Sequence, residues 1–564
     1  MFKKLLNILD SKKKFQLIVL IFLYMPLNLI ETLSLTSIPG FIIFIDNPEV
    51  LYKYFDLHSF MGLLDKLSFK DRVYLGSISL ICIFIVRGFF IFLINSYGYY
   101  LKYKITMSNS RKLYLSYLSR PYKFHINNNA SNLAQNMSDS LKSTVVVMAY
   151  ANIIKDVILL TFIFSVIYFA TPNEFLKIIL FTITPALILF IIIKNKLKKL
   201  GKIGRNFRLA AHKSLIEGFS NIKYILINNS TKTFLKDYYR KQQTSQKQDT
   251  FLAVFNISPR ILIELACLSF VVIFIIINAN INESVNSFLP TLTLIVVAAV
   301  RIIPALGQIS VNLNSIKFQS YTVDRINSEI LNWKEDQKNQ IYKSEIKKIE
   351  KFNKKISLKN INFSYVPEKP IIENLSIDLT KNQKLGISGP SGSGKTTITD
   401  IILGLLKPDK GAVTCDEVNI NEDINGWRRL ISFVPQNIVL LDDTIEKNIS
   451  FNFDNKEIDQ DRYNKALQIS GLDKIIDQFP QKDQTKIGFF ANKISGGQKQ
   501  RIGLARAVYE DKSILILDEA TNSLDKVSEN KIIDMLFRSN QTIILVSHDL
   551  DLIEKCDNKL IINN

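Results

Sequence analysis

The order of apolar and polar residues divides the chain near residue 320. Before that point, apolar runs recur that reach the length of about 20 residues that a helix needs to cross a membrane. They lie at residues 15–45, 73–95, 144–170, 175–193, 252–279 and 288–309. The first follows a basic N-terminus, but it is longer than the apolar core of a secretory signal and shows no clear small-residue cleavage site. We therefore predict an α-helical membrane bundle of about six helices.

The chain after about residue 351 follows a different pattern. Short strand-like and helix-like segments alternate there, separated by Gly, Pro, Asn and Asp. The stretch at 334–351, between the two patterns, is rich in Lys, Glu and Asn, as expected of a solvated linker. We predict a transmembrane domain at 1–325, a linker at 326–355 and an α/β domain at 356–564.

The composition agrees with more than one domain. With 564 residues, of which 47% are hydrophobic and 22% charged, the chain is too long for one compact core and too apolar to be disordered. A formal charge of +20 suits nucleic acid as well as anionic lipid headgroups. The cysteines have no CxxC spacing and no histidine cluster nearby, so we expect free thiols. They are Cys82, Cys267, Cys415 and Cys556.

The distribution of Lys and Arg favours the membrane and orients the bundle. Cytoplasmic flanks of membrane helices carry an excess of both residue types. Residues 102–123 and 194–247 are rich in them, whereas the turns at 171–174 and 280–287 contain neither. Both termini and the two long hydrophilic connections are therefore predicted to be cytoplasmic. The first outer connection departs from this pattern because it carries Lys53, Lys66 and Lys70.

The connections between spans carry their own periodicity. Apolar residues recur at roughly helical spacing from Phe207 to Phe219, so the inner connections are predicted to continue the spans as helices that present short helices to the following domain. Ordinary solvated loops are the alternative. The outer segment at 47–71 also has apolar residues at helical spacing. It is either an amphipathic helix in the outer interface or a structured loop.

Charged residues inside the spans form a further group of candidates, because such charges are costly and tend to face a cavity or a partner. Lys155 and Asp156 lie in the third span, and Arg260 precedes Glu264 by four residues in the fifth. One interpretation is that Arg260 pairs with Glu264, and that the other charges pair locally or extend to an interface. The other is that arginines line a translocation path for an anionic group. The candidates are Arg87, Arg260 and Arg301.

The strongest local signal for chemistry is a glycine-rich sequence at residues 389–396. It reads Gly-Pro-Ser-Gly-Ser-Gly-Lys-Thr, lies between a strand-like and a helix-like segment, and fits the phosphate-binding pattern GxxxxGK[ST]. The backbone amides of such a turn close around phosphates at a helix N-terminus. Lys395 would reach the β- and γ-phosphates, and Thr396 would bind Mg²⁺. The predicted nucleotide contacts here are Gly389, Ser391, Gly392, Gly394, Lys395, Thr396 and Thr397.

Two carboxylates follow the apolar run at 513–517. A buried strand that delivers Asp518 and Glu519 at its C-terminal end suits the first as a Mg²⁺ partner and the second as a base for the attacking water. Strands ending in acidic residues are common, so this pair alone is a weak signal. Combined with the phosphate-binding loop, it indicates nucleotide hydrolysis.

A third motif resembles the ATP-binding-cassette (ABC) family. Residues 494–501 read Ile-Ser-Gly-Gly-Gln-Lys-Gln-Arg, similar to the family signature with Ile in place of the usual Leu. The resemblance includes the Q-loop glutamine, which would act in catalysis and Mg²⁺ binding, the D-loop aspartate, the catalytic switch histidine and the aromatic residue that stacks on adenine. These residues are Gln436, Asp525, His548 and Tyr365. Considered alone, Tyr365 would be a half-buried strand residue and His548 a core or surface histidine.

The resemblance implies that the signature of one subunit contacts ATP held by another. The signature residues are Ser495, Gly496, Gly497 and Gln498. Two ATPs would then lie between two ATPase domains, so a chain with one such domain must pair. A homodimer is the simplest pairing because the chain has a full set of site residues, and a heterodimer stays open. One departure is that exporters usually carry an acidic residue before the signature, where residues 485–490 have none. Coupling to transport is therefore expected to use different contacts.

The order of the two halves, membrane spans first, resembles exporters and flippases. More narrowly, the chain resembles the flippase of bacterial N-glycosylation, which moves undecaprenyl-diphosphate-linked oligosaccharide. Residues 258–260, Arg301 with Pro304 and the outer segment carry this resemblance. It implies a bacterial inner-membrane flippase that uses ATP and Mg²⁺, with the three arginines receiving the diphosphate.

Two other functions stay open at this point. An exporter of peptide, lipid A or drug would have the same architecture and would not need the arginines. A non-transporting ATPase of nucleic-acid maintenance is disfavoured because such proteins lack membrane spans, so no nucleic-acid partner is expected.

Overall fold

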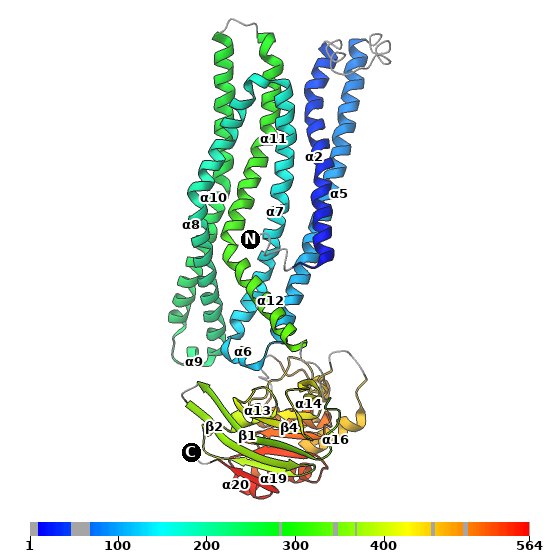
Figure 1. Ribbon diagram of the computed structural model, residues 1–564, viewed down its shortest axis with the longest axis vertical. Coiled ribbons are helices and arrows are strands. Elements are labelled where there is room, and N and C mark those ends of the chain that lie inside the picture. Colours follow the sequence, from blue (N-terminus) through cyan, green and yellow to red (C-terminus); the bar gives the residue numbers. More distant parts are fainter. Residues whose placement is uncertain are drawn as a thin grey trace. The chain divides into compact units, whose positions relative to one another are not determined.

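The computed structural model describes residues 9–46, 68–280, 285–341, 348–366, 369–452, 457–488 and 494–562. The chain forms two compact units (Figure 1). The first comprises Met1–Arg120 and Phe124–Asn339, and the second comprises Pro121–Lys123 and Gln340–Asn564. Most of the outer segment predicted at 47–71 lies outside the described residues, and the exact domain boundaries stay predictions.

Six long helices dominate the described part of the first unit, and each contains a stretch long and apolar enough to cross a membrane. They are α2 (Ser11–Asp46), α5 (Phe69–Leu118), α7 (Ala130–Ala170), α8 (Pro172–Ser220), α10 (Thr231–Asn280) and α11 (Val285–Phe318). Every predicted span falls inside one of these helices. The prediction of a six-helix membrane bundle is therefore confirmed.

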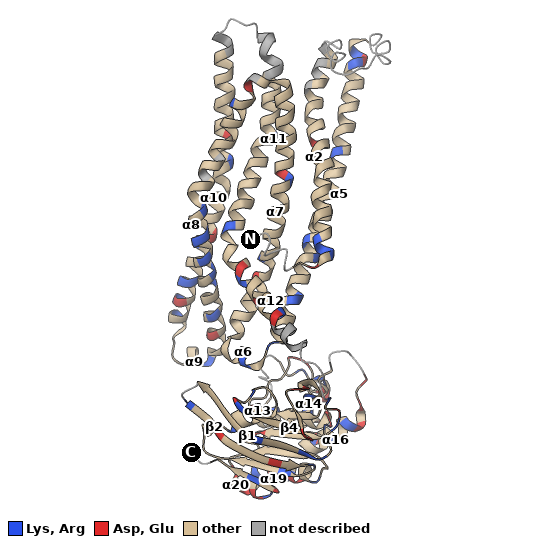
Figure 2. Ribbon diagram, in the orientation of Figure 1, with Lys and Arg blue, Asp and Glu red and all other residues tan. Residues whose placement is uncertain are grey.

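The inner connections are helical, as their periodicity indicated. Helix α8 continues well past its apolar stretch, and the short helix α9 (Ile222–Ile227) joins it to α10. On the other connection, α5 is followed by the short helix α6 (Tyr122–Asn127). Lys and Arg gather on the parts of α8 and α10 nearer to α9, whereas the remainder of the two helices carries few of them (Figure 2).

Apolar side chains both hold the helices together and cover their outer surfaces. One buried cluster joins α7, α10 and α11 through Ile163, Ile263 and Ile302. Another includes Val323 and Ile330 of α12 (Ser320–Ile341), which follows α11. Large side chains elsewhere on the bundle are exposed, and such apolar surface is expected of helices that face lipid.

Two sheets organise the second unit. An antiparallel sheet has the order β2-β1-β4-β5, and a parallel sheet has the order β6-β7-β8-β3-β9. The antiparallel strands are β1 (Lys355–Val366), β2 (Lys369–Thr380), β4 (Lys410–Cys415) and β5 (Val418–Asn419). The parallel strands are β3 (Lys384–Ser388), β6 (Ile431–Val434), β7 (Ile514–Asp518), β8 (Thr542–Val546) and β9 (Asn558–Ile561).

Helices complete this unit. They are α13 (Lys395–Ile402), α14 (Ile424–Arg429), α15 (Ile445–Ser450), α16 (Gln460–Ser470), α17 (Asp473–Ile476), the 3-10 helix η1 (Lys482–Gln484), α18 (Gly496–Tyr509), α19 (Lys526–Phe537) and α20 (Leu550–Glu554). This arrangement of sheets and helices is the α/β domain predicted from the alternating pattern. The four cysteines of the chain have free thiols.

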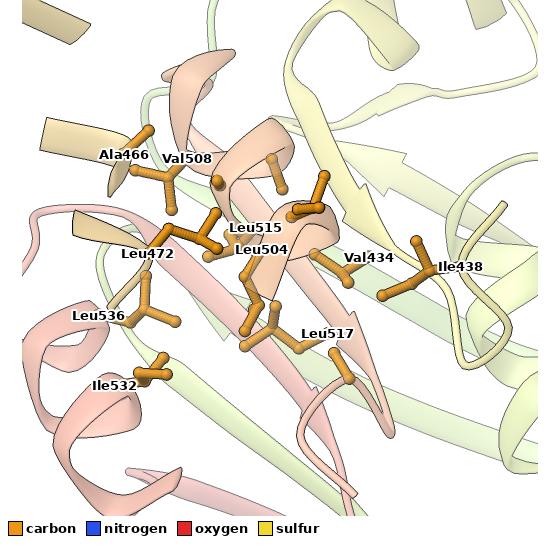
Figure 3. Packing of buried hydrophobic residues seen from close by; sticks show 14 of the residues in the cluster. Val434, Ile438, Ala466, Leu472, Leu504, Val508, Leu515, Leu517, Ile532 and Leu536 are labelled. Atoms are coloured by element: carbon orange, nitrogen blue, oxygen red, sulfur yellow. The ribbon is translucent and has the colours of Figure 1, made fainter. Parts of the chain in front are cut away.

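Strand β7 shows why the parallel sheet is buried on both faces. Alternate side chains of a strand point to opposite faces. Leu515 and Leu517 pack with Leu504 of α18 and Ile532 of α19 (Figure 3). Ile516, on the other face, packs in a second cluster with residues of α13 and β1. A continuous apolar strand is therefore fixed between two layers, which positions the two carboxylates that end it.

Candidate functional site

The glycine-rich loop lies where the sequence predicted it. Buried strand β3 ends at Ser388 and α13 begins at Lys395, so residues 389–394 form the turn between them. Gly392 and Gly394 have φ of +85° and +94°, the left-handed region that favours glycine. A Cβ at Gly389 would lie 2.8 Å from the carbonyl oxygen of Ile562. All three glycines of the loop are thus required by conformation or by space.

Lys395 is buried within this loop. Its Nζ donates to the carbonyl oxygens of Gly389 and Pro390, both at 2.9 Å. The ammonium group is therefore held by the backbone of the loop, and among the ion pairs of the described residues none joins it to a carboxylate. A cation placed in this way is available to the phosphates of a nucleotide.

Glu519 is held by three side chains from different segments. Gln436 Nε2 donates to Glu519 Oε2 at 2.6 Å, and Asn522 Nδ2 donates to the same oxygen at 3.0 Å. His548 Nε2 lies 3.0 Å from Glu519 Oε1. Glu519 itself has φ of +49°, a strained conformation for a residue with a side chain. The carboxylate is thus fixed in orientation, as a base that acts on one bound water must be.

Asp518, at the end of β7, is a buried acid. Burial and, to a smaller extent, the charge of Glu519 raise the pKa of its carboxyl, Lys395 partly offsets this, and the resulting pKa is about 6. Burial likewise raises the pKa of Asp400 to about 6, with a contribution from Asp518. Buried carboxylates close to one another are destabilised in their charged form and fit a divalent cation, because Mg²⁺ prefers oxygen ligands. The residues present therefore fit the Mg²⁺ site predicted around Asp518 and Thr396.

One pocket of about 260 Å³ collects most of the predicted site. Residues from the loop, the Q-loop, the end of β7 and the segment after β8 meet there. Its lining comprises Ile371, Ser391, Gly392, Gly394, Lys395, Thr396, Thr397, Gln436, Glu519 and His548. These residues are up to 177 positions apart in the chain, from 371 to 548, so the fold assembles the pocket.

Two residues at or beside this pocket were not predicted from the sequence, and one predicted residue, Tyr365, lies at its edge. Ile371 of β2 lines the pocket, and Asn522 binds Glu519. A polar residue three positions after Glu519 was a signal for Asn522, whereas an isoleucine in a strand gives none. Tyr365 of β1 is 43% exposed, and its hydroxyl lies 3.5 Å from Thr397 Oγ1. An exposed ring beside the loop is available for stacking.

The signature residues lie outside this lining. Ser495 caps α18 by accepting from the backbone N–H of Gln498, whose side chain accepts from the Ser495 backbone in return. Gln500 accepts from the backbone N–H of Ser523 at 2.7 Å, so α18 is attached to the D-loop. Asp525 caps α19 through the N–H of Ser528. In the described part of the chain, Ser495 and Asp525 therefore have local capping contacts and do not reach the chain's own nucleotide pocket.

In the membrane bundle, two of the three candidate arginines share one carboxylate. Arg87 Nη2 of α5 donates to Glu31 Oε1 of α2 at 3.2 Å, and Arg301 Nη1 of α11 lies 3.6 Å from the same oxygen. The side chains of Arg87 and Glu31 are 13% exposed and that of Arg301 is 28% exposed. The Nε atoms of both arginines are buried and have no hydrogen-bond partner. We call these three residues the Glu31 cluster.

Arg260 lies elsewhere on the bundle. Its Cβ would be 3.5 Å from a Cβ added to Gly307, so α10 packs against α11 at that point. Gly307 is six residues after Arg301, which corresponds to roughly 9 Å along a helix. Among the ion pairs of the described residues, Arg260 does not pair with Glu264, although Lys155 pairs with Asp156 at 3.5 Å. Ion pairing is thus found for Arg87 and Arg301, whose shared partner Glu31 lies on another helix, and the roles of the three arginines stay predictions.

The chain is similar to several known proteins. Residues 372–522 match the model of the ABC transporter family. The ATP-dependent lipid A-core flippase 2 of Colwellia psychrerythraea is 27% identical over 512 residues, 87% of this chain and 83% of that one. An ATP-dependent lipid A-core flippase of Ralstonia nicotianae is 33% identical over 223 residues, 39% of this chain and 38% of that one.

A solved structure extends the similarity to the whole fold. A bacterial Atm1-family ABC exporter with ATP bound superimposes with a TM-score of 0.72 at 18% identity, over 98% of this chain and 94% of that one. Six apolar helices followed by an ABC ATPase domain are thus an ABC exporter fold, as predicted. The ATPase domain binds ATP with Mg²⁺ and hydrolyses it in a process coupled to transport. The chain thus combines an ABC transporter ATPase domain with six helices that are long and apolar enough to cross a membrane.

Proposed function

We propose that this exporter is a flippase that moves a polyprenyl-diphosphate-linked oligosaccharide across the bacterial inner membrane, with its ATPase domain in the cytoplasm. The observation that carries the proposal is the Glu31 cluster, where two guanidinium groups on different helices converge inside an apolar bundle. Charges in such a place are costly and are retained for a function. Guanidinium groups suit a diphosphate because they bind its oxygens in pairs.

Glu31 occupies the position at these arginines where we propose that the anionic headgroup of the cargo binds. One carboxylate bridges two guanidinium groups, so the arginines together carry one more positive charge than their partner. Their unpartnered Nε atoms leave further donors for a ligand with more acceptor oxygens. A diphosphate, with more oxygens and more charge than a carboxylate, would displace Glu31 from the pair. Arg260, which lies beside Gly307 of α11, would contact the same headgroup.

For the nucleotide site we propose roles that follow from the geometry. Lys395 and the loop, including Gly389, would bind the phosphates, with Tyr365 stacked on the base. Glu519 would accept a proton from the attacking water while Gln436 and His548 hold its carboxylate. Thr396, Gln436 and Asp518 would hold Mg²⁺, which would supply positive charge to the phosphates.

We further propose that the chain works as a homodimer. Ser495 and Asp525 do not line the described nucleotide pocket of their own chain, as expected if two subunits exchange signature motifs. Ser495, Gly496, Gly497 and Gln498 would then contact ATP bound to Lys395 of the other copy. Hydrolysis by a purified dimer and its loss on dilution to monomers would test this pairing.

The proposed cargo is tested by flipping of a fluorescent polyprenyl-diphosphate oligosaccharide in proteoliposomes. Wild type is compared with Glu519→Gln and Arg260→Ala, and Lys155→Gln serves as a matched control because it removes a span cation that pairs with its own neighbour. We expect ATP-dependent flipping in wild type and Lys155→Gln, and its loss in the other two variants. Flipping lost with Glu519→Gln but unchanged with Arg260→Ala would contradict the proposed contact to the diphosphate.

Lipid A-core is a second candidate cargo, because two relatives of the chain are named as flippases for it. Phosphate groups on such a lipid would use the same arginines. The same proteoliposomes loaded with labelled lipid A-core separate the two candidates. Flipping of lipid A-core without flipping of the polyprenyl-diphosphate oligosaccharide would replace our first candidate by the second.

A further inference from the structure

Five lysines follow the apolar part of α8 within nine residues. They are Lys194, Lys196, Lys198, Lys199 and Lys202. The next basic residues of the same helix all have carboxylate partners. Arg205 pairs with Asp139 at 2.8 Å, Arg208 with Asp249 at 2.8 Å and Lys213 with Glu217 at 3.6 Å.

Within the described ranges, the five lysines have no such partners. Among the ion pairs formed by described residues, none joins a carboxylate to a lysine between positions 194 and 202, although Lys196 lies over the ring of Phe251 at 4.6 Å. Along α8, the change from basic residues without a carboxylate partner to basic residues with one occurs within a single turn, between Lys202 and Arg205. The protein thus compensates basic charge in the part of α8 farther from the apolar stretch and leaves it uncompensated next to that stretch.

Three of these lysines line a defined pocket. It has a volume of about 330 Å³ and is lined by Asn195, Lys198, Lys199, Lys202 and Tyr321. The four α8 residues are spaced at three or four positions and so lie on one face of the helix. The Nζ of Lys202 lies 5.6 Å from the centre of the Tyr321 ring. Tyr321, at the start of α12, thus brings its ring next to Lys202.

A close approach of two helices builds this pocket. A Cβ at Gly201 would lie 1.9 Å from the carbonyl oxygen of Phe318, so only glycine permits α8 to approach the end of α11 this closely. Because α12 begins two residues later, the approach brings Tyr321 beside Lys198 and Lys202. The pocket is therefore part of the helix packing rather than a chance grouping of surface side chains.

The direction of α8 points these lysines toward the membrane. Side chains of a helix are tilted toward its N-terminus, and the N-terminal part of α8 is the apolar stretch. Lys198 and Lys202 are five and nine positions past Ile193, roughly 7 and 14 Å along the helix. Long lysine side chains directed back along this distance reach the headgroup region. On α10, which enters its apolar stretch at the other end, lysines are tilted away from it.

We propose that this pocket binds the phosphate headgroup of an anionic phospholipid of the surrounding leaflet. Unpaired lysines next to a membrane helix attract anionic lipid. The pocket adds an open hollow of about 330 Å³ whose lining includes Asn195 and Tyr321, two residue types that can donate to phosphate oxygens. The site is separate from the Glu31 cluster and does not depend on which cargo is moved.

The test is titration of the detergent-solubilised full-length protein with phosphatidylglycerol, followed by native mass spectrometry. We compare wild type with the triple variant Lys198→Gln/Lys199→Gln/Lys202→Gln. The matched control removes the same charge from α10 by Lys232→Gln/Lys236→Gln/Lys247→Gln. We expect the α8 variant to bind the tightest lipid about tenfold or more weakly, and the α10 control to change its affinity by less than twofold.

Three further measurements identify the ligand. Phosphatidylcholine, which has no net charge, is expected to bind wild type and the α8 variant equally. Inorganic phosphate at the same concentration is expected not to displace phosphatidylglycerol, because it lacks the acyl chains that place the headgroup. A polyprenyl diphosphate that binds this pocket while phosphatidylglycerol does not would overturn the assignment to bulk lipid. An equal loss of phosphatidylglycerol binding in the α8 and α10 variants would contradict the assignment of the lipid to this pocket.

Discussion

The nucleotide pocket and the Glu31 cluster both bring cations close to carboxylates, but they balance the charges differently. In the pocket, Lys395 binds two backbone carbonyls, and Glu519 is held by neutral or titratable side chains. In the cluster, Glu31 bridges Arg87 and Arg301 directly. The first site keeps its cation available for a phosphate, whereas in the second a carboxylate of the protein itself already pairs with both cations.

This difference predicts how the nucleotide and the cargo would each bind. A nucleotide enters a pocket whose groups already have the geometry they need, so its binding costs little rearrangement. A cargo anion at the cluster must compete with Glu31 for the same guanidinium groups. If the proposed cargo binds there, the cluster should discriminate against weak or singly charged anions, because a ligand must interact with the arginines more strongly than the Glu31 carboxylate does in order to displace it.

The largest effect is expected for Glu519→Gln. An amide cannot accept the proton of the attacking water, so the rate of ATP hydrolysis should fall about 100-fold or more. The measurement is phosphate release by the reconstituted protein. Binding of a fluorescent ATP analogue should persist in this variant and be lost in Lys395→Ala. Hydrolysis within threefold of wild type would show that Glu519 is not the base.

The double variant Arg87→Ala/Arg301→Ala tests the other site. It should raise the cargo concentration needed for half-maximal flipping about tenfold or more, since charge-assisted hydrogen bonds to a phosphate are lost. Lys155→Gln provides the control, because that lysine pairs with adjacent Asp156. An equal effect in the control would assign the loss to the bundle as a whole and not to the cluster.

Glu31→Gln should act in the opposite direction. The amide keeps the size and a hydrogen-bond acceptor but removes the competing negative charge, so half-maximal flipping should need about threefold to tenfold less cargo. The variant should also respond to singly charged lipids that wild type rejects. Cargo dependence identical to that of wild type would mean that Glu31 does not compete with the cargo.

The smallest effect is expected at the edge of the nucleotide pocket. Tyr365→Phe removes a hydroxyl that lies 3.5 Å from Thr397 Oγ1, at the limit of a hydrogen bond, and keeps the ring. The affinity for ATP should change less than twofold, whereas Tyr365→Ala should weaken it about fivefold through loss of stacking. Titration with a fluorescent ATP analogue measures both. Equal losses in the two variants would contradict stacking as the role of the ring.

The two regions also differ in how far the sequence alone predicted them. The phosphate-binding loop and the carboxylates after β7 were predicted because each is a contiguous motif attached to a strand. The pairing of Arg87 with Glu31 was not, since the two residues are 56 positions apart and on different helices. The i,i+4 pair of Arg260 with Glu264 was a reasonable local expectation, but packing against Gly307 on α11 directs that part of α10 instead.

The sequence by itself determined the six apolar helices, the α/β domain and the nucleotide motifs, because hydrophobic periodicity and backbone requirements of a phosphate loop are local properties of the chain. The tertiary structure decided which charges meet. Glu31 comes between two arginines, and Lys198 comes beside Tyr321, only because helices distant in sequence pack at close range, in the second case through Gly201. Side-chain charges act over a few ångströms, and such distances between helices are set by packing across the whole bundle.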